Sequence, residues 1–454
     1  MSKKIIVIGG GPGGYAAAIK AAQLGAEVTL AEAVQIGGTC LNVGCIPTKA
    51  LLRVGEFYRN ASKNMVAGVN ITGAKLDWAA ALRHKDDVVK QLTGGVNALL
   101  RYNEVTVINE TAVMFSEKKV KIRDTVYDAD AVILALGSVN TSLAFPGAEL
   151  TGVIDSEAAI SSETVPKSIA IVGGGVIGSE FAALYTSLGV VVTIIEALPE
   201  ILPSVDSEIA ELMHETFAQS GVAVFTGARL KGAQRTGGEM LVSFETNGEL
   251  QSVTAEKLLV AVGRRPNCGY LEGAGIVIEH GAICVDENFE TSISGVYAVG
   301  DCNGKTMLAH AAMAQGVVAA EHIMGCTARY NAKVVPGCVF TAPEIASVGM
   351  TEQQVIESGI PHNIGRFNLS GNGRATIHGE DGLIKIIADK KLGEILGVHM
   401  IGPHVTEIIA EAALAMSMEG TVEDIVNTIH AHPTVSEALC EAAMSVFGKP
   451  IHGI

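Results

Sequence analysis

Aromatic residues and positive charges are both scarce in this chain of 454 residues. Phe, Trp and Tyr make up only 4% of it, whereas 52 residues are glycine, and this balance is typical of α/β folds whose backbone approaches phosphate closely. The shortage of Lys and Arg gives a formal net charge of −16, which argues against nucleic acid or an anionic membrane as a general partner. We therefore expect no nucleic-acid partner and no membrane partner.

Cysteines and long apolar runs are few as well. Eight cysteines in so long a chain do not make the dense framework of a secreted disulfide scaffold. The first apolar run, Ile5–Ile8, is ended by Gly9, which makes it too short for a signal peptide or a membrane span. Every later run is broken by charged, polar or glycine residues before it reaches spanning length. These absences predict a soluble cytoplasmic protein.

The composition and length favour several large hydrophobic cores. The chain is 48% hydrophobic and 18% charged, so disorder is not expected, and its length suggests about three or four domains. Near the C-terminus, apolar runs predict strands at Gly382–Ala388 and Ile395–Met400, followed by an amphipathic helix over Val405–Met418. This order is typical of an α+β module.

One pattern occurs twice: strand, glycine-rich turn, helix, strand and then an acid. It covers Lys4–Glu32 and Ser168–Glu196, and each copy has the length of a βαβ unit. Two such units predict two separate nucleotide sites in an α/β protein.

The first copy contains the dinucleotide fingerprint G-x-G-x-x-G at Gly9, Gly11 and Gly14. The first glycine makes the tight turn, the second admits the pyrophosphate, and the third lets helix and strand pack closely. Glu32 ends the next strand, where a carboxylate can accept hydrogen bonds from ribose hydroxyls. The alternative is a glycine turn that binds no ligand.

The second copy places the same fingerprint at Gly173, Gly175 and Gly178. Glu196 follows in the position of the acid, and no arginine lies near it in the sequence. A carboxylate there repels a 2′-phosphate, so this unit is predicted to bind NAD in preference to NADP. The alternative is that Glu196 is a solvated residue at a strand end.

Cys40 and Cys45 are separated by four residues, directly after the first βαβ unit. On a regular helix this spacing is too long for an unstrained disulfide, whose Cα atoms lie about 4.4–6.8 Å apart. Closure would need a distorted backbone, which Gly44 helps to permit, and a strained disulfide is easily reduced. The alternatives are a structural disulfide and half of a zinc site; further ligands do not follow closely, so no metal is predicted.

The segment GTCLNVGCIPTKALL, residues 38–52, resembles the active site of the pyridine-nucleotide disulfide oxidoreductases, and most closely of the members that oxidise dihydrolipoamide. The resemblance covers essentially the whole chain. It implies an α/β fold with two Rossmann-like dinucleotide-binding domains, for FAD and NAD, plus an α+β C-terminal dimerisation domain. The expected boundaries are 1–142 for the FAD domain, 143–266 for the NAD domain, 267–335 for a central domain that completes the FAD site, and 336–454 for the dimerisation domain.

The resemblance also implies roles around the cysteines. Cys40 would exchange with the substrate thiol, and Cys45 would be the thiolate beside the flavin. Lys49 would approach the flavin and pair with Glu180, and a positive charge there stabilises both reduced flavin and thiolate. The implied activity is oxidation of the dihydrolipoyl groups of a 2-oxoacid dehydrogenase or glycine-cleavage complex, with NAD as acceptor. The alternatives are another NAD(P)H-dependent FAD disulfide reductase, or chiefly a docking component of a multienzyme complex.

Further cofactor contacts follow from the resemblance. Asp301 would bond the ribityl chain of FAD, and Gly263 would lie at the NAD unit. Leu136 departs from the Ala-Thr-Gly turn of the family at this position. The other residues assigned to FAD are Gly38, Thr39, Ala112, Gly137, Leu308, Ala309 and His310.

The last landmark is the pair of His432, followed by proline, and Glu437. A carboxylate bonded to one ring nitrogen fixes the tautomer of a histidine and raises the basicity of the other nitrogen. In the family this histidine is the acid–base group, and the glutamate orients it. His430 is the alternative base. The resemblance further implies that the base serves the cysteines of the partner subunit in a homodimer, and that the other partner is a lipoyl-bearing protein.

Overall fold

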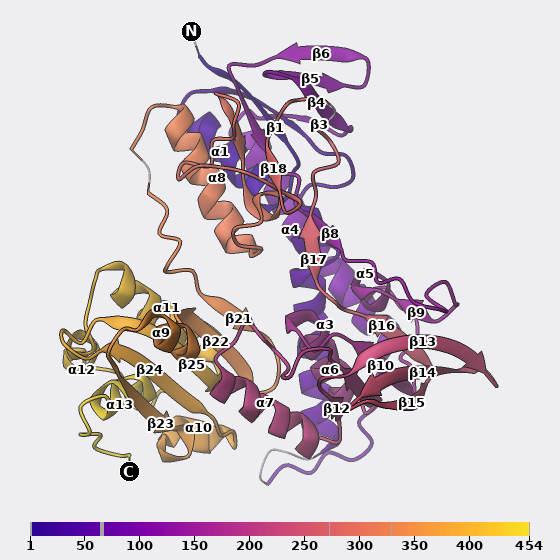
Figure 1. Ribbon diagram of the computed structural model, residues 1–454, viewed down its shortest axis with the longest axis vertical. Coiled ribbons are helices and arrows are strands. Elements are labelled where there is room, and N and C mark those ends of the chain that lie inside the picture. The colour runs from indigo at the N-terminus through magenta and orange to yellow at the C-terminus, as the bar shows by residue number, and fades with distance from the viewer. Residues whose placement is uncertain (1, 64–67, 272, 328, 454) are drawn as a thin grey trace.

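The computed structural model describes residues 2–63, 68–271, 273–327 and 329–453, and it shows an α/β protein (Figure 1). The first sheet is parallel, with strand order β20-β7-β1-β2-β3. Its strands are β1 Lys4–Ile8, β2 Glu27–Ala31, β3 Thr106–Ile108, β7 Ala131–Leu134 and β20 Val296–Ala298. Helices cover one of its faces and the antiparallel strands β4 Ala112–Ser116 and β5 Lys119–Ile122 the other, so β1 and β7 are continuous apolar runs buried on both sides.

The helices of this first part are α1 Pro12–Gln23, α2 Gly38–Asn42, α3 Cys45–Ser62, α4 Trp78–Tyr102 and α8 Ala309–Ile323. A small antiparallel sheet of β4, β5 and β6 Thr125–Asp128 packs against the face of the first sheet that the helices leave open. Because β20 and α8 follow the second unit in the sequence, the chain returns to the first sheet after leaving it.

The second sheet repeats the first. Its order is β12-β11-β10-β16-β9, and β10 pairs with β11 in parallel just as β1 pairs with β2. The strands are β9 Val153–Ile154, β10 Ser168–Val172, β11 Val191–Ile195, β12 Ala223–Phe225 and β16 Lys257–Val260. The helices are α5 Ser156–Ile160, α6 Val176–Ser187 and α7 Ser207–Gln219. A separate antiparallel sheet consists of β13 Arg229–Thr236, β14 Glu239–Thr246 and β15 Glu249–Ala255. Both predicted βαβ units are therefore present.

Two short antiparallel strands connect the two units. The chain leaves the first unit through β8 Ser138–Asn140 and returns through β17 Arg264–Pro266. In Figure 1 this pair lies between the two large sheets. The returning chain then forms β18 Ile278–Glu279, β19 Ala282–Ile283 and the short 3-10 helix η1 Gly300–Asn303.

The C-terminal part is an antiparallel sheet with helices, as the α+β prediction requires. Its order is β21-β22-β25-β24-β23. The strands are β21 Gly337–Val339, β22 Glu344–Gly349, β23 His362–Asn368, β24 Leu383–Asp389 and β25 Ile395–Gly402; the helices are α9 Glu352–Ser358, α10 Gly373–His378, α11 Val405–Ser417, α12 Val422–Asn427 and α13 Glu437–Ser445. β24, β25 and α11 agree with the predicted elements to within one or two residues at each end.

A buried ion cluster joins the second unit to the C-terminal sheet. Lys385 on β24 is only 1% exposed, and its Nζ lies 2.8 Å from Asp206, 2.9 Å from Glu208 and 2.6 Å from Glu352. Asp206 caps α7, and its second oxygen accepts the backbone N–H of Glu352 at the start of α9. Arg366 on β23 adds a second cation, 2.8 Å from Glu208. We call these five residues the Lys385 cluster.

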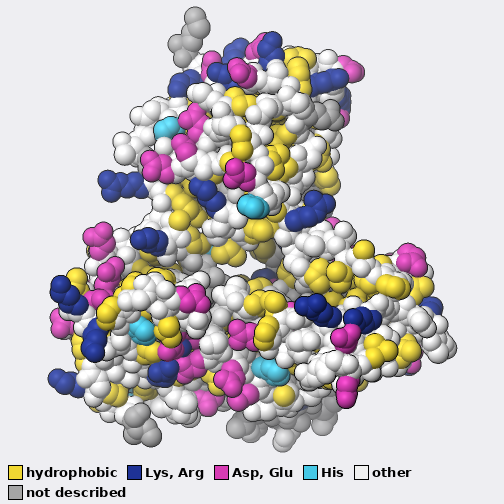
Figure 2. Space-filling view, in the orientation of Figure 1, with side chains coloured by type: hydrophobic (Ala, Val, Ile, Leu, Met, Phe, Trp, Pro, Cys, Tyr) yellow, Lys and Arg dark blue, Asp and Glu magenta, His cyan; other side chains and the backbone are white. Residues whose placement is uncertain are grey.

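No membrane-crossing helix is found in the part of the chain that the structure describes, because none there is both long and apolar enough. The surface mixes charges of both signs, and it is hollowed between the part around β1 and the two lower parts (Figure 2).

Candidate active site

The outer glycines of each fingerprint are required by packing. Gly9 has φ of +102°, and a Cβ there would lie 2.2 Å from the carbonyl oxygen of Ala135. A Cβ on Gly14 would lie 1.8 Å from the oxygen of Gly9, because α1 and β1 meet at this point. Gly173 and Gly178 repeat both conflicts, so side chains at these four positions would disrupt the turn itself.

The middle glycine of each fingerprint has no such neighbour. A Cβ on Gly11 would have only the Cα of Gly38, at 3.8 Å, and a Cβ on Gly175 would have nothing within 4 Å. Gly11 and Gly175 are also the N-caps of α1 and α6 and provide no side-chain cap. Each loop therefore leaves open space against uncapped helical N–H groups, which suits a pyrophosphate.

The acids of the two units are held in the same way. Glu32 accepts the N–H of Gly10 at 2.7 Å, and Glu196 accepts the N–H of Gly174 at 2.5 Å. Each carboxylate therefore lies against its own glycine loop, where the ribose next to a bound pyrophosphate would be.

Replacing Gly175 with alanine is expected to weaken NAD binding by about tenfold without destabilising the protein, since the new methyl group enters only the space kept for the ligand. NAD titration and thermal unfolding measure the two effects. Gly178→Ala is the matched control: its Cβ would lie 1.9 Å from the oxygen of Gly173, so it should lower the melting temperature. Unchanged NAD affinity in Gly175→Ala would contradict this assignment of the second loop.

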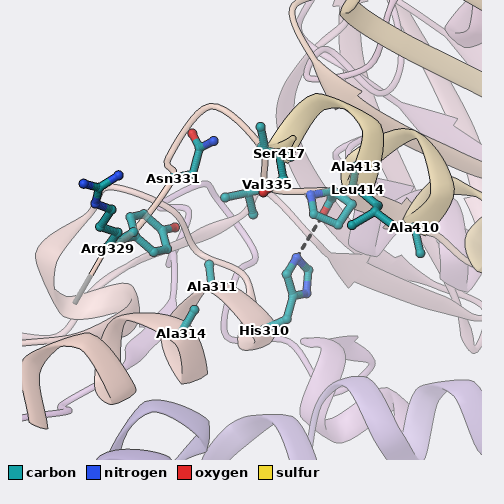
Figure 3. Close-up of a pocket in the computed structure, with 13 residues that line it drawn as sticks. His310, Ala311, Ala314, Arg329, Asn331, Val335, Ala410, Ala413, Leu414 and Ser417 are labelled. Carbon is teal, nitrogen blue, oxygen red and sulfur yellow. Dashed lines mark hydrogen bonds between the residues drawn. The ribbon is translucent and has the colours of Figure 1, made fainter. Parts of the chain in front are cut away.

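A third uncapped helix start lies beside the first loop. The N-cap of α8 is Leu308, without a side-chain cap, and Ala309 and His310 begin the helix. α8 packs closely on α1, because a Cβ on Gly316 would lie 2.4 Å from the oxygen of Gly13. The Nε2 of His310 donates a hydrogen bond to the carbonyl of Pro336 at 2.7 Å (Figure 3). A cavity of about 490 Å³ lies next to His310, between α8, the segment 329–336 and α11 (Figure 3).

The other predicted cofactor residues lie on several elements, and one of them contacts the first loop directly. Gly38 lies against Gly11: its Cβ would be 2.7 Å from the Cα of Gly11. Thr39 lies one residue further on in α2, and Gly137, with φ of +69°, follows β7. Ala112 begins β4 and is buried. In the second unit Gly263, with φ of +99°, precedes β17.

Asp301 lies in η1 and is held by a group that the sequence did not point to. Its Oδ2 accepts a hydrogen bond from Ser138 at 2.6 Å, and Ser138 in turn accepts one from Arg264 at 2.8 Å. Ser138 and Arg264 lie on β8 and β17. No periodicity or spacing signals these contacts, because the two residues are far apart in the sequence.

Cys40 and Cys45 lie on either side of a break between two helices. α2 ends at Asn42 and α3 begins at Cys45, so the backbone between the cysteines is irregular, as their spacing predicted. A Cβ on Gly44 would lie 2.9 Å from the oxygen of Thr39, so glycine permits this close path. Neither cysteine is bonded to another here.

The two thiols differ in acidity. A hydrogen bond from Cys40 lowers the pKa of Cys45 to about 7; burial opposes the shift, and the positive charge of Lys49 adds to it. The same hydrogen bond, with burial, raises the pKa of Cys40. In the dithiol form Cys45 is thus the more acidic thiol and ionises before Cys40.

Lys49, one turn further along α3, forms an ion pair with Glu180 on α6. Its Nζ lies 2.8 Å and 2.7 Å from the two carboxylate oxygens. The side chain of Glu180 is 5% exposed and also accepts the N–H of Phe340 at 3.0 Å. The ring of Phe340 lies 4.9 Å from the ammonium. Residues from three distant parts of the chain thus fix one positive charge near the cysteines.

Alkylation of the reduced protein should report this charge. The iodoacetamide rate at Cys45, followed by mass spectrometry, is expected to rise with pH around a midpoint near 7, because only the thiolate reacts. Lys49→Met should move the midpoint upward, since it removes a charge that favours the thiolate. Lys63→Met, an exposed change at the end of the same helix, should leave it unchanged. If the midpoint in Lys49→Met equalled that of the parent, Lys49 would not be a cause of the low pKa of Cys45.

His432 and Glu437 form the predicted contact. The Nδ1 of His432 lies 2.9 Å from Glu437, whose other oxygen accepts the N–H of Thr434 at 2.8 Å. Although burial acts in the opposite direction, these hydrogen bonds lower the pKa of Glu437. The side chain of His432 is 80% exposed, and no described residue bonds its Nε2. That nitrogen is free to exchange a proton with a ligand.

His430 is placed differently. Its side chain is buried, its Nδ1 bonds the oxygen of Thr428 at 2.9 Å, and its Nε2 bonds Glu411 at 2.7 Å. With both ring nitrogens engaged, it has no nitrogen left for a substrate.

The structure does not bring His432 to the cysteines of its own chain. The segment between α12 and α13 lies at the outer side of the C-terminal part, whereas α3 lies at the centre of the molecule (Figure 1). Lys49 and Glu180 join the cysteines, and the histidine–glutamate pair stays apart from them.

Comparisons with known proteins match both the part of the chain with the cysteines and the part with His432. A family model described as pyridine nucleotide-disulphide oxidoreductase matches residues 3–316, and the model of the dimerisation domain of that family matches residues 335–443. The second match supports a homodimer.

Individual proteins are similar over their whole length. The chain is 42% identical to a dihydrolipoyl dehydrogenase of Thermus scotoductus (strain ATCC 700910 / SA-01), covering 99% of this chain and 98% of that protein. It is 40% identical to a dihydrolipoyl dehydrogenase of Bacillus subtilis (strain 168), with the same coverage. Its structure is similar to that of the flavoprotein disulfide reductase RclA from Escherichia coli, with a TM-score of 0.85, 26% identity and 96% and 98% of the two chains covered.

Proposed function

The chain belongs to the pyridine nucleotide-disulphide oxidoreductase family, and from this premise we propose that it oxidises dihydrolipoyl groups to lipoyl groups with NAD as the electron acceptor. One observation carries the proposal: Cys40 and Cys45 lie beside the Lys49–Glu180 ion pair, where the hydrogen bond from Cys40 and the charge of Lys49 lower the pKa of Cys45. The identity of about 40% to dihydrolipoyl dehydrogenases over nearly the full length supports the choice of substrate.

The family implies FAD and a pyridine nucleotide. We assign FAD to the loop of Gly9, Gly11 and Gly14, with Glu32 on the adenosine side and Asp301 near the ribityl chain. NAD is assigned to the second loop, because Glu196 lies where an NADP phosphate would be. When bound, FAD would carry the electron pair between the cysteine dithiol and NAD.

The residues of the chain perform the thiol chemistry. A substrate thiol gives its proton to His432 of the partner subunit, and the resulting thiolate attacks Cys40 in the Cys40–Cys45 disulfide. That bond breaks, a mixed disulfide forms, and Cys45 leaves as the thiolate. The second substrate thiol then attacks the substrate sulfur of the mixed disulfide, so lipoamide leaves and Cys40 takes a proton.

The exchange transfers two electrons from the substrate to the cysteine pair, and the two substrate protons go to His432 of the partner subunit and to Cys40. Restoring the disulfide sends a hydride equivalent to NAD⁺ and releases one proton to water. The low pKa of Cys45 makes it a good leaving group, and Lys49 holds the negative charge that develops there.

The setting of the reaction is also part of the proposal. The active site would be shared across a homodimer, since His432 lies apart from the cysteines of its own chain (Figure 1). The second partner would be a lipoyl-bearing protein of a 2-oxoacid dehydrogenase or glycine-cleavage complex in the cytoplasm. A docking role in such a complex is compatible with catalysis.

A second candidate is reduction of another disulfide with NAD(P)H. The fold similarity to a protein named as a flavoprotein disulfide reductase favours it, because this fold carries that activity at 26% identity. Glu196 weighs against NADPH as the donor.

The test is the purified holoenzyme assayed for NAD⁺ reduction by dihydrolipoamide, with NADP⁺ in parallel. Fast turnover with NAD⁺ alone would support the proposal. If the FAD-loaded protein did not oxidise dihydrolipoamide, the substrate assignment would be wrong. NADH oxidation with other disulfides would then test the second candidate.

A further inference from the structure

We propose that Ser138 and Arg264 are positioning residues that hold the carboxylate of Asp301 in place for the polyol chain of the flavin cofactor. The inference rests on the flavin site assigned above. It also extends that site to the two connecting strands, because Ser138 begins β8 and Arg264 begins β17.

Asp301 uses only one of its oxygens within the protein. Oδ2 accepts the hydrogen bond from Ser138 at 2.6 Å, a length typical of a hydroxyl bound to a charged oxygen. Within the described ranges no group donates to Oδ1. The carboxylate is therefore fixed through one oxygen and keeps the other available for a ligand hydroxyl.

Ser138 is itself fixed by two bonds from one guanidinium. Nε of Arg264 donates to Oγ of Ser138 at 2.8 Å, and Nη2 donates to its carbonyl at 2.7 Å. The donors of arginine lie in a rigid plane, so the two bonds set the position of the hydroxyl. Because Oγ accepts from arginine, its single hydrogen is directed to Asp301.

The remaining arm of Arg264 reaches the second unit. Nη1 donates to the amide oxygen of Asn140 at 2.5 Å, and that amide donates to Asp155 at 3.0 Å. Asp155 caps α5 through the N–H of Ala158 at 2.9 Å. The guanidinium of Arg264 is thus linked through one side chain to a carboxylate in each nucleotide-binding unit. Ser138 links it to Asp301 in the first unit, and Asn140 links it to Asp155 in the second.

The next residue supplies a control. Arg265 is exposed, and its side chain makes no hydrogen bond or ion pair within the described part of the chain. Successive side chains of a strand point to opposite faces, so Arg265 does not contact Ser138. It has the same charge as Arg264 and the next position in the sequence.

The experiment measures the dissociation constant of FAD from each apoprotein by flavin fluorescence, together with the absorption spectrum of the bound flavin. Ser138→Ala and Arg264→Lys are expected to raise the constant by about tenfold, since the first removes the donor to Asp301 and the second removes the paired bonds that orient this donor. Ser138→Thr keeps the hydroxyl, and Arg265→Lys changes no contact, so both should stay close to the parent. Thermal unfolding of the apoproteins checks that all four variants fold.

Two results would overturn the inference: parental FAD affinity in both Ser138→Ala and Arg264→Lys, or an equal loss in Arg265→Lys. FAD binding is measured without dihydrolipoamide, so a parent that binds FAD but has no dihydrolipoamide activity contradicts only the proposed substrate. A parent that binds no FAD overturns both proposals.

Discussion

Cys45→Ser is expected to reduce dihydrolipoamide-dependent NAD⁺ reduction by at least about 10³-fold, because the residues of such a relay act as one unit and none replaces another. Serine keeps the size of the side chain, but it forms no disulfide and stays protonated where the Cys45 thiol, with a pKa of about 7, ionises. FAD content should stay unchanged, since Cys45 lies outside the glycine loop. Steady-state kinetics and the flavin spectrum measure the two quantities.

Cys326→Ser is the matched control for this variant. Cys326 is an exposed free thiol outside the site, so its replacement should keep full activity. If Cys45→Ser turned over at the parental rate, the disulfide mechanism would be wrong, whatever the protein's substrate.

His432→Gln should lower kcat by roughly 10² to 10⁴-fold, the usual contribution of a positioned acid–base group. Steady-state kinetics with dihydrolipoamide measure the loss. The control is His430→Gln, whose parent side chain is buried and bonded to Glu411 and Thr428. His430→Gln should lower the melting temperature and leave kcat close to that of the parent. If it lowered kcat more than His432→Gln does, His430 would be the base.

Mixing the two inactive variants tests whether the site is shared. In a mixed dimer of Cys45→Ser and His432→Gln chains, one site combines both defects and the other combines two intact parts. Random exchange of subunits should therefore restore about one quarter of parental activity in a symmetric dimer. If the histidine served its own chain, mixing would restore nothing.

The parts predicted well are those whose chemistry is local in sequence. Each βαβ unit was visible because turn glycines, helix and acid follow one another, and packing makes Gly9 and Gly14 indispensable at fixed spacing. The break between α2 and α3 followed from the separation of Cys40 and Cys45. Local constraints of this kind leave their mark on consecutive residues.

The parts missed depend on long-range contacts. Ser138 and Arg264 meet Asp301 only because two short strands pair, and nothing in their neighbours distinguishes Arg264 from the exposed Arg265. The long-range pairing of Lys49 with Glu180 was predicted correctly, but from the family resemblance and not from spacing. Lys385 sits in an apolar strand where burial of a lysine is improbable until its acidic partners are located.

The Lys385 cluster has a consequence for temperature. Burying charged groups costs hydration free energy, and that cost falls on heating because the hydration of ions has a strongly negative entropy. Five charged side chains joining α7, α9 and two strands therefore oppose the separation of the second unit from the C-terminal sheet more effectively in hot solution than in cold.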